Sequence, residues 1–279
     1  MLLLSDDVPY TEALASREGR VVLPTDLRTD MLDRLPPAVR AHATFSAAMV
    51  HGEYLAVIDR VLRGLVAGDL SMAEAFGELD RMLAELGFPP LAESQQGDVT
   101  EHRTRGRINL ILSHLLAQAG NHGQWERGMH ADLREDEPCW EFYRAFPRNE
   151  PRSWGPRFLA AGGPPGGVLG SGTSVRLIAR KDDPVWQSRV LNRFGTPYPP
   201  FDFNSGYRFR GVDRDRAVEL GLIDEDEIPG LPPDGEAFLS ASSAFKNHPA
   251  AVQQAILDEL GHTVEFGDDD VLTMRRPAE

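Results

Sequence analysis

The chain has 279 residues, of which 41% are hydrophobic, and a formal net charge of −14. This length and apolar content suffice for one large hydrophobic core or two modest ones, which argues against disorder of the whole chain. The single cysteine, Cys139, excludes an intramolecular disulfide framework and fits a reducing cytosol. We expect no signal peptide, anchor or membrane span, because no window approaches the roughly 18 apolar residues that a span needs.

Charge is distributed unevenly along the chain. Residues 1–99 hold 8 basic against 16 acidic side chains, residues 100–216 hold 18 against 13, and residues 217–279 hold 3 against 14. This basic surplus in the centre is too small for general duplex binding, which requires several phosphates to be neutralised on one surface. It suits contact with an acidic protein surface, or docking of the chain's own acidic ends. Nearly all basic residues are arginines, which a GC-rich genome would also explain,.

Residues 1–98 are predicted to form an N-terminal helical region. Apolar residues recur at helical spacing from Leu55 to Leu65 and again from Met72 to Leu86,. Ser71 and Glu74 form a capping-box signature at the start of the second stretch. Two such helices joined by a short turn make a helical hairpin, and its apolar stripe indicates burial without any chemistry.

The central region, residues 99–223, follows a polar stretch at Ala92–Asp98 that we interpret as a linker. Apolar spacing predicts a helix from about Arg103 to Gln118,. Three arginines crowd the first turn of this helix, where the helix dipole disfavours cations. They are consistent with a partner surface or with a solvated charged face. They are Arg103, Arg105 and Arg107.

A segment rich in aromatic residues and prolines closes the central region. It contains the motif Asp182-Asp183-Pro184-x-Trp186, the run Pro197–Phe203 and the turn Asn204-Ser205-Gly206. Proline fixes φ and lacks an N–H donor, so this segment cannot be a central strand or a helix interior. We predict a rigid, buried, irregular segment with Trp186 packed against Phe201 or Phe203, in a region with little regular structure.

This order of motifs resembles the C-terminal half of phage head morphogenesis proteins of the Mu F-like minor head family. The likeness extends over roughly residues 104–223, with a helix that begins at Arg107–Asn109 and ends at Gln124-Trp125. Trp140, Tyr143 and Pro151-Arg152-x-Trp154 follow in the family's order. The residues that would form the core of the module are Asp183, Pro184, Trp186, Pro199, Pro200, Phe201 and Asn204.

Two departures from the family pattern limit what the resemblance implies. Where many relatives have an Asn-Cys-Arg-Cys run after the paired prolines, this chain has Asn204-Ser205-Gly206-Tyr207. An Arg-x-x-His element that is common upstream is also missing. No metal or thiol role is therefore carried over to these positions.

The resemblance implies a minor head protein of a phage or prophage, present in low copy at the portal and the inner face of the procapsid. Such a protein is assembled in the bacterial cytoplasm, acts in head morphogenesis without enzymatic activity or small-molecule substrate, and can contact packaged DNA weakly. The alternatives are a hydrolase or toxin-like transferase fused to such a module, and a DNA-binding head factor.

A surface for the portal or another head protein is predicted from the basic residues of the central region. The arginines expected to contribute are Arg103, Arg105, Arg107, Arg180, Arg208 and Arg210. Arginines near aromatic residues are enriched in interface cores. The alternative is intramolecular, with the acidic run Asp224–Glu227 docked on these arginines.

Several motifs mimic chemical sites without meeting their requirements. The glycine-rich stretch Ala160–Ser174 is predicted to be a loop, and its second half mimics a phosphate-binding loop but has Thr173 in place of the essential lysine,. Histidines 114, 122 and 130 are eight residues apart, unlike the i, i+4 pairs of helical zinc sites. Asp268–Asp270 lacks the downstream glutamate and the spacing of a calcium loop. The adjacent side chains of Asp182 and Asp183 point in different directions, and Pro184 after them favours a turn-initiating or capping role. We expect no nucleotide, metal or other cofactor, no catalytic residue, and a buried, inert Cys139.

The C-terminal region, residues 224–279, is predicted to be an acidic arm. A short helix before it ends at Gly221, and a second helix covers about Pro249–Leu260,. Thr263–Phe266 and Val271–Met274 then flank a turn and predict a hairpin. The whole chain is therefore expected to be α+β, with a mainly helical N-terminal region, an irregular aromatic and proline-rich central module and small β elements.

Overall fold

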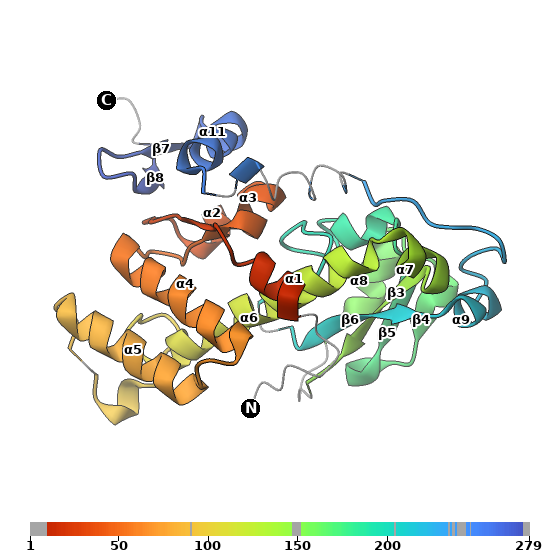
Figure 1. Ribbon diagram of the computed structural model, residues 1–279, viewed down its shortest axis with the longest axis horizontal. Helices are drawn as coiled ribbons and strands as arrows, with labels where there is room; N and C mark the ends of the chain where they lie inside the picture. The colour runs from red at the N-terminus through yellow and green to blue at the C-terminus, as the bar shows by residue number, and fades with distance from the viewer. Residues whose placement is uncertain are drawn as a thin grey trace. The chain divides into compact units, whose positions relative to one another are not determined.

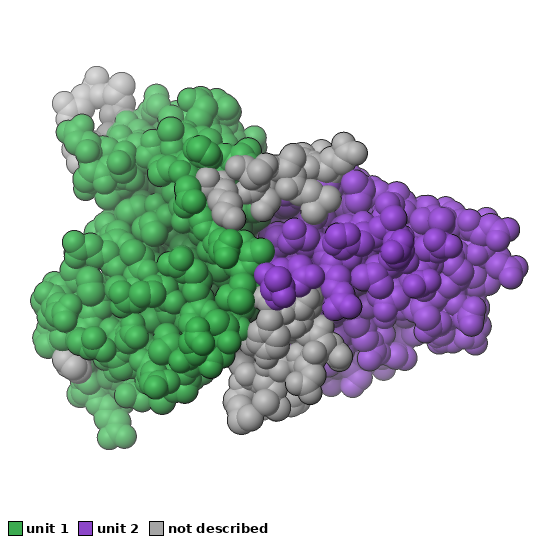
Figure 2. All heavy atoms as spheres, viewed as in Figure 1, with its two compact units in different colours: residues 1–2, 14–119, 241–279 green, residues 3–13, 120–240 purple. Residues whose placement is uncertain are grey.

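The computed structural model describes residues 10–89, 91–146, 152–203, 205–233, 235, 238, 244–245 and 247–275. Helices and small sheets occur together, so the predicted α+β class is confirmed. By internal contacts the chain forms two compact units: unit 1 comprises residues 1–2, 14–119 and 241–279, and unit 2 comprises residues 3–13 and 120–240 (Figure 2). Their bounds differ from those of the three predicted regions, because C-terminal elements pack with N-terminal ones in unit 1.

Unit 1 contains the helical hairpin that the sequence predicts. Its helices are α4 (Gly52–Ala67) and α5 (Met72–Glu85), which pack against each other. Gly68 ends α4 with a φ of 80°, a left-handed conformation that a residue without Cβ adopts at little cost,. The capping box at the start of α5 is confirmed, since the Glu74 N–H donates to Ser71 Oγ and the Ser71 N–H donates to the Glu74 carboxylate at 2.7 Å.

The rest of unit 1 joins segments that lie far apart in sequence. Thr25 Oγ1 donates to the carbonyl of Leu272 at 2.7 Å. The elements here are α2 (Thr29–Leu32), α3 (Pro37–His42), the parallel pair β1 (Val21–Val22) and β2 (Ala43–Thr44), α11 (Pro249–Leu260), and the hairpin of β7 (Val264–Phe266) and β8 (Leu272–Met274). Their apolar side chains form one cluster, which includes Leu27, Leu35, Val39, Val252, Ile256 and Leu272. The predicted C-terminal helix and hairpin are thus confirmed.

One long helix, α6 (Arg105–Gly128), belongs to both units. It continues ten residues beyond the end at Gln118 that apolar spacing predicts, and this extension includes glycines that disfavour helix,. Gly123 has a packing reason: a Cβ there would lie 2.7 Å from the backbone nitrogen of Ala13, in the first helix, α1 (Tyr10–Ala15). Close approach of two backbones, rather than helix propensity, accounts for this residue.

Unit 2 is built on a four-stranded antiparallel sheet (Figure 1). Its strand order is β4 (Val168–Leu169), β5 (Arg176–Arg180), β3 (Cys139–Arg144) and β6 (Tyr207–Val212). The prediction of little regular structure in this region is therefore wrong. The strands are short and have large side chains or charges on both faces, so they lack the clean alternation of apolar and polar residues that marks a half-buried strand.

The two faces of this sheet differ in what covers them. On one face Trp140, Phe142, Tyr207 and Phe209 are buried in an aromatic core. On the other face, Cys139, Ile178 and Val212 at one end pack under Ala217 of α9 (Arg214–Glu219) and its flanking apolar residues. Among the described residues, unit 2 also contains α7 (Ala131–Asp136), α8 (Trp154–Ala160), and the 3-10 turns η2 (Pro165–Gly167), η3 (Gly172–Ser174) and η4 (Pro184–Gln187), and unit 1 contains the 3-10 turn η1 (Glu93–Gln95).

Candidate functional site

The Asp-Asp-Pro-x-Trp motif forms the 3-10 turn η4. The Asp183 carboxylate accepts a hydrogen bond from the Val185 N–H at 2.8 Å, and Pro184 occupies the first position of the turn. Proline suits that position because its φ is already fixed and it has no N–H to satisfy. Burial raises the pKa of the Asp183 carboxyl. These two residues therefore set the direction in which the chain turns toward Trp186.

Trp186 lies in the aromatic core of unit 2 and is 1% exposed. Its Nε1 donates to the carbonyl of Arg180 at 2.8 Å, which satisfies the polar end of the indole. Its ring lies 4.9 Å from that of Phe209, 5.7 Å from Phe158 and 6.3 Å from Phe201. The prediction that Trp186 packs against Phe201 is confirmed. Phe203 instead contacts Phe194, with ring centroids 5.0 Å apart.

Asn192 organises the segment between Trp186 and the paired prolines. Its buried side-chain Nδ2 donates to the carbonyls of Trp186 at 2.8 Å and Thr196 at 2.5 Å. Its Oδ1 accepts from the N–H groups of Phe194 and Gly195. This residue was missed at the sequence level, where an Asn-Arg-Phe-Gly run indicates only a turn. The peptide bond between Pro199 and Pro200 is cis, Phe201 is fully buried, and Asn204 lies outside the described residues.

Arg180 is held by carboxylates of its own chain. Its Nε and Nη2 donate to the two oxygens of Asp182, each at 2.9 Å, and Nη1 donates to Glu227. Burial by itself would raise the pKa of Asp182, but hydrogen bonds from Arg180 and from the Gly230 N–H lower it. For Arg180 the structure therefore shows the intramolecular alternative, in which the acidic run Asp224–Glu227 docks on the arginines, because Glu227 of this run is one of its partners.

A group of charged residues occupies the open end of the second sheet face, and we call it the arginine face. It consists of Arg176 on β5, Glu141 and Tyr143 on β3, and Arg208 and Arg210 on β6. Antiparallel register places Glu141 opposite Arg210 and Tyr143 opposite Arg208. Since side chains alternate along strands, these residues share the face opposite the aromatic core. Three guanidinium groups and one carboxylate therefore share this face.

Glu141 is the centre of the arginine face. Its side chain is only 6% exposed, yet it lies 2.7 Å from Arg210 Nε and 3.2 Å from Arg176 Nη1. The hydrogen bond to Glu141 raises the pKa of Arg210. Arg210 also lies over the Tyr143 ring, with its Cζ 4.8 Å from the ring centroid. Both arginines are thus fixed by one buried carboxylate while about half of each side chain stays exposed.

Arg208 differs from its neighbours on the arginine face. Its Cζ lies 5.2 Å from the ring centroid of Phe146, which is itself 38% exposed. Within the described part of the chain, no carboxylate lies at ion-pair distance from Arg208. Burial of the side chain lowers its pKa. Arg208 is therefore stacked on an aromatic ring and carries a charge that the described residues leave unneutralised.

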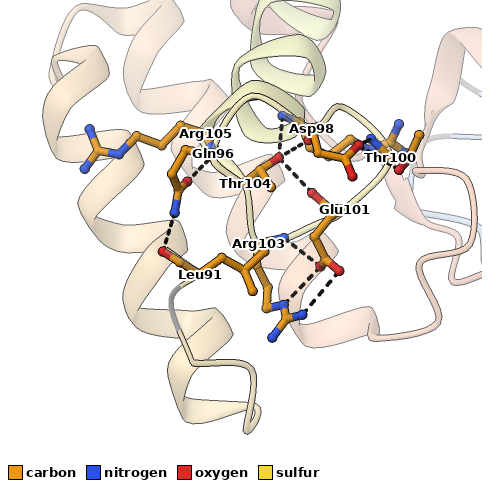
Figure 3. Close-up of polar contacts among 9 residues, drawn as sticks. Leu91, Gln96, Asp98, Thr100, Glu101, Arg103, Thr104 and Arg105 are labelled. Carbon is orange, nitrogen blue, oxygen red and sulfur yellow. Dashed lines mark hydrogen bonds and ion pairs between the residues drawn. The ribbon is translucent and has the colours of Figure 1, made fainter. Parts of the chain in front are cut away.

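The other three predicted arginines lie in unit 1: Arg103 just before α6, and Arg105 and Arg107 in its first turn. Figure 3 shows Arg103 and Arg105 with their surroundings. Arg103 Nε donates to Glu101 at 3.0 Å. Arg105 lies 3.8 Å from Asp80, and its guanidinium lies over the ring of Phe76. Arg103 and Arg105 thus have different neighbours.

Arg107 points into unit 1 rather than to solvent. Its Nη2 donates to Ser46 Oγ at 2.9 Å, and burial lowers its pKa. Thr104 satisfies the helix terminus, because its Oγ1 accepts the Arg107 N–H at 3.1 Å and donates to the carbonyl of Glu101. The first turn of α6 is therefore a locally satisfied helix start, and its arginines do not form one continuous surface.

Two buried charged groups were also missed at the sequence level. In unit 1, Arg17 is fully buried, forms an ion pair with Asp59 and donates to Thr44 Oγ1 at 3.0 Å. Thr44 in turn donates to Asp59 at 2.9 Å, which closes a triad. No local motif could reveal this triad, because Arg17 and Asp59 are separated by 42 positions.

In unit 2, Lys181 is buried beneath Trp140. Its Nζ donates to the carbonyls of Gly128 and Leu133, near the ends of α6 and α7, and lies 4.4 Å from the Trp140 ring centroid. Burial lowers the pKa of Lys181 to about 8. Burial also raises the pKa of the neighbouring Cys139 thiol to about 12, so the thiol stays protonated at neutral pH,.

The glycine-rich stretch is more ordered than its composition indicates. It contains β4, which pairs with β5, and a Cβ at Gly167 would collide with the carbonyl oxygen of Ile178. The prediction of a loop is therefore wrong for this part. The three-residue turn η3, rather than a long helix, follows the glycines, so the strand-loop-helix context of a phosphate-binding loop is not met,.

The described residues contain no group of three or more His, Cys, Asp or Glu side chains that could hold a metal ion. None of their helices is both long and apolar enough to cross a membrane.

Comparisons with protein-family models, with curated proteins and with solved structures give no match. The likeness to the Mu F-like family therefore depends on the motif residues themselves.

Proposed function

We propose that this chain is a minor head protein of a phage or prophage, a structural and assembly component without enzymatic role. The observation that supports this best concerns the residues that carry the family resemblance. Asp183, Pro184 and Trp186 direct the chain into the aromatic core, where Trp186 meets Phe201. The motif residues thus have a structural role in unit 2, as expected of a module whose function depends on its fold rather than on catalysis.

The proposed role places the protein at the portal and the inner face of the procapsid, assembled in the host cytoplasm. An assembly factor needs a rigid module with an open surface for its neighbours. Unit 2 offers both: a core that contains Trp140, Trp154 and Trp186, and the exposed charges of the arginine face. Aromatic and arginine side chains are enriched where protein interfaces bury their centres.

Co-purification tests this proposal. The affinity-tagged chain is co-expressed with the portal protein encoded in the same phage genome, and portal protein expressed without it is the control on the same resin. We expect the portal to be retained only when the chain is present. Mass spectrometry of purified particles supplies a second readout, in which peptides of this chain should be detected. Absence of the chain from particles, together with no portal retention, would refute the proposal.

A further inference from the structure

We propose that the arginine face binds an acidic segment of a protein partner, whose carboxylates pair with Arg176, Arg208 and Arg210. This inference deepens the proposed head-assembly role, on which the identity of the partner as a head protein rests. It also revises the predicted surface: Arg208 and Arg210 stay in it and Arg176 joins it. The other four predicted arginines contact groups of their own chain and leave the surface: Arg103, Arg105, Arg107 and Arg180.

The arrangement of charges on the face is suited to carboxylates. Glu141 neutralises one of three positive charges and fixes Arg176 and Arg210 from below, at 3.2 Å and 2.7 Å. Each guanidinium has five N–H donors, so outward-facing donors remain for a partner carboxylate. Arginine pairs with carboxylates in a bidentate geometry that lysine cannot reproduce.

The face is also held in place before any partner arrives. Arg210 lies over Tyr143, and Arg208 lies over the partly exposed ring of Phe146. Side chains that are already ordered lose less conformational freedom on binding, so more of the contact energy appears as affinity. In addition, β6 is the last strand in the sheet order, which places Arg208 and Arg210 at an edge of the sheet.

The charge balance favours a protein partner over nucleic acid. Nucleic-acid binding relies on many neutralised phosphates, whereas this face has three arginines around a buried glutamate. The chain as a whole has a net charge of −14, which repels a polyanion at longer range,. A short acidic segment presents few charges and fits the size of the face.

The alternative is that these arginines only protect the sheet edge. Charged side chains on an edge strand prevent pairing with the edge of another copy. This explanation predicts that loss of the charges causes self-association and leaves binding of an acidic ligand unchanged. The two explanations are therefore separable by experiment.

The test uses the full chain and a fluorescein-labelled Glu-rich peptide, followed by fluorescence anisotropy. We expect R176Q/R208Q, which leaves the Glu141–Arg210 pair intact, to weaken peptide binding about tenfold, since two charge pairs with the peptide are lost, one at the exposed Arg176 and one at the partly buried Arg208,. The matched control R28Q/R60Q removes the same charge from exposed arginines of unit 1 and should bind as the wild type does. R176K/R208K should bind between the two, because it keeps the charge but loses bidentate contacts.

Several outcomes would overturn the inference. Equal binding by R176Q/R208Q and the control would do so, as would self-association of R176Q/R208Q with unchanged peptide binding. Tighter binding of a single-stranded oligonucleotide of equal charge than of the peptide would assign the face to nucleic acid instead. Far-UV circular dichroism and melting temperature verify that each variant is folded.

Portal co-purification separates this inference from the proposed function. If R176Q/R208Q retains the portal as well as the wild type does, the head role stands and the arginine face is not its docking surface. If the wild type binds the peptide through these arginines but retains no portal, the surface stands and the head role fails.

Discussion

Replacing Trp186 with alanine should destabilise unit 2 severely. The side chain is 1% exposed and lies among Phe158, Phe201 and Phe209, so its removal leaves a cavity, which for Trp→Ala typically costs about 3–5 kcal/mol,. The carbonyl of Arg180 also loses its indole donor but keeps a hydrogen bond from the Asp183 N–H at 3.2 Å, so this loss adds only about 0.5–1.5 kcal/mol,. Trp186→Phe keeps most of the ring volume but loses this hydrogen bond, so we expect a smaller loss.

Urea unfolding followed by far-UV circular dichroism measures these losses. Hydrogen exchange of β3, β5 and β6 amides assigns them to unit 2. Leu159→Ala is the control, because Leu159 on α8 is 45% exposed and its truncation should cost no more than about 0.5 kcal/mol,. The reasoning is refuted if Trp186→Ala is within about 1 kcal/mol of this control, since a buried ring so enclosed cannot be removed at that cost.

Three further predictions concern other parts of the molecule. Asp59→Asn removes the charge that neutralises the buried Arg17 and should lower the free energy of unfolding by about 3–5 kcal/mol,. The control Arg60→Gln breaks the exposed ion pair with Glu78 and should cost at most about 1 kcal/mol,. Equal urea midpoints for the two variants would contradict this prediction. Burial lowers the pKa of His114 to about 3, whereas the pKa of an unfolded histidine is near 6.5,. Between these two pH values the unfolded chain binds one proton more than the folded chain, so the free energy of unfolding falls as the pH falls. His114→Leu should therefore reduce the loss of stability measured between pH 7 and pH 4, and an unchanged loss would argue against this reasoning. Gly167→Ala should lower the melting temperature because its Cβ collides with a backbone carbonyl, while Gly77→Ala, on an exposed helix position with open space, should raise it slightly; the same sign for both would refute the argument,.

The helices of unit 1 could be predicted well from the sequence because their signals are local. Apolar residues at helical spacing, the Ser71 capping box and the Gly68 terminus lie within a few residues of one another. The same holds for α11, which the structure places at Pro249–Leu260 as predicted. A helix or hairpin whose signals lie within its own sequence can be predicted without knowledge of tertiary contacts.

The sheet of unit 2 could not be predicted in this way, because its pairing is non-local. β3 pairs with β5 and β6, which lie tens of residues further along the chain, and these neighbours determine which side chains are buried. Glu141 illustrates the difficulty: a glutamate in a strand indicates an exposed position, yet two arginines from other strands allow its burial. Arg176 was missed for the same reason, since only the pairing of β5 with β3 brings it to Glu141.

The motif and the arginine face support different kinds of conclusion. The motif residues are constrained by packing and hydrogen bonding inside unit 2, as the Asp183 cap and the Trp186 packing show. Their likeness to a family is therefore evidence about the fold of unit 2 rather than about its partner. The arginines that we propose to bind a partner lie on the opposite face of the same sheet. The aromatic side chains of β3 and β6 hold the sheet in shape from one face, which fixes the backbone that presents Arg208 and Arg210 on the other. Core variants should therefore reduce peptide binding only by unfolding unit 2, whereas arginine-face variants should weaken it about tenfold while the fold persists.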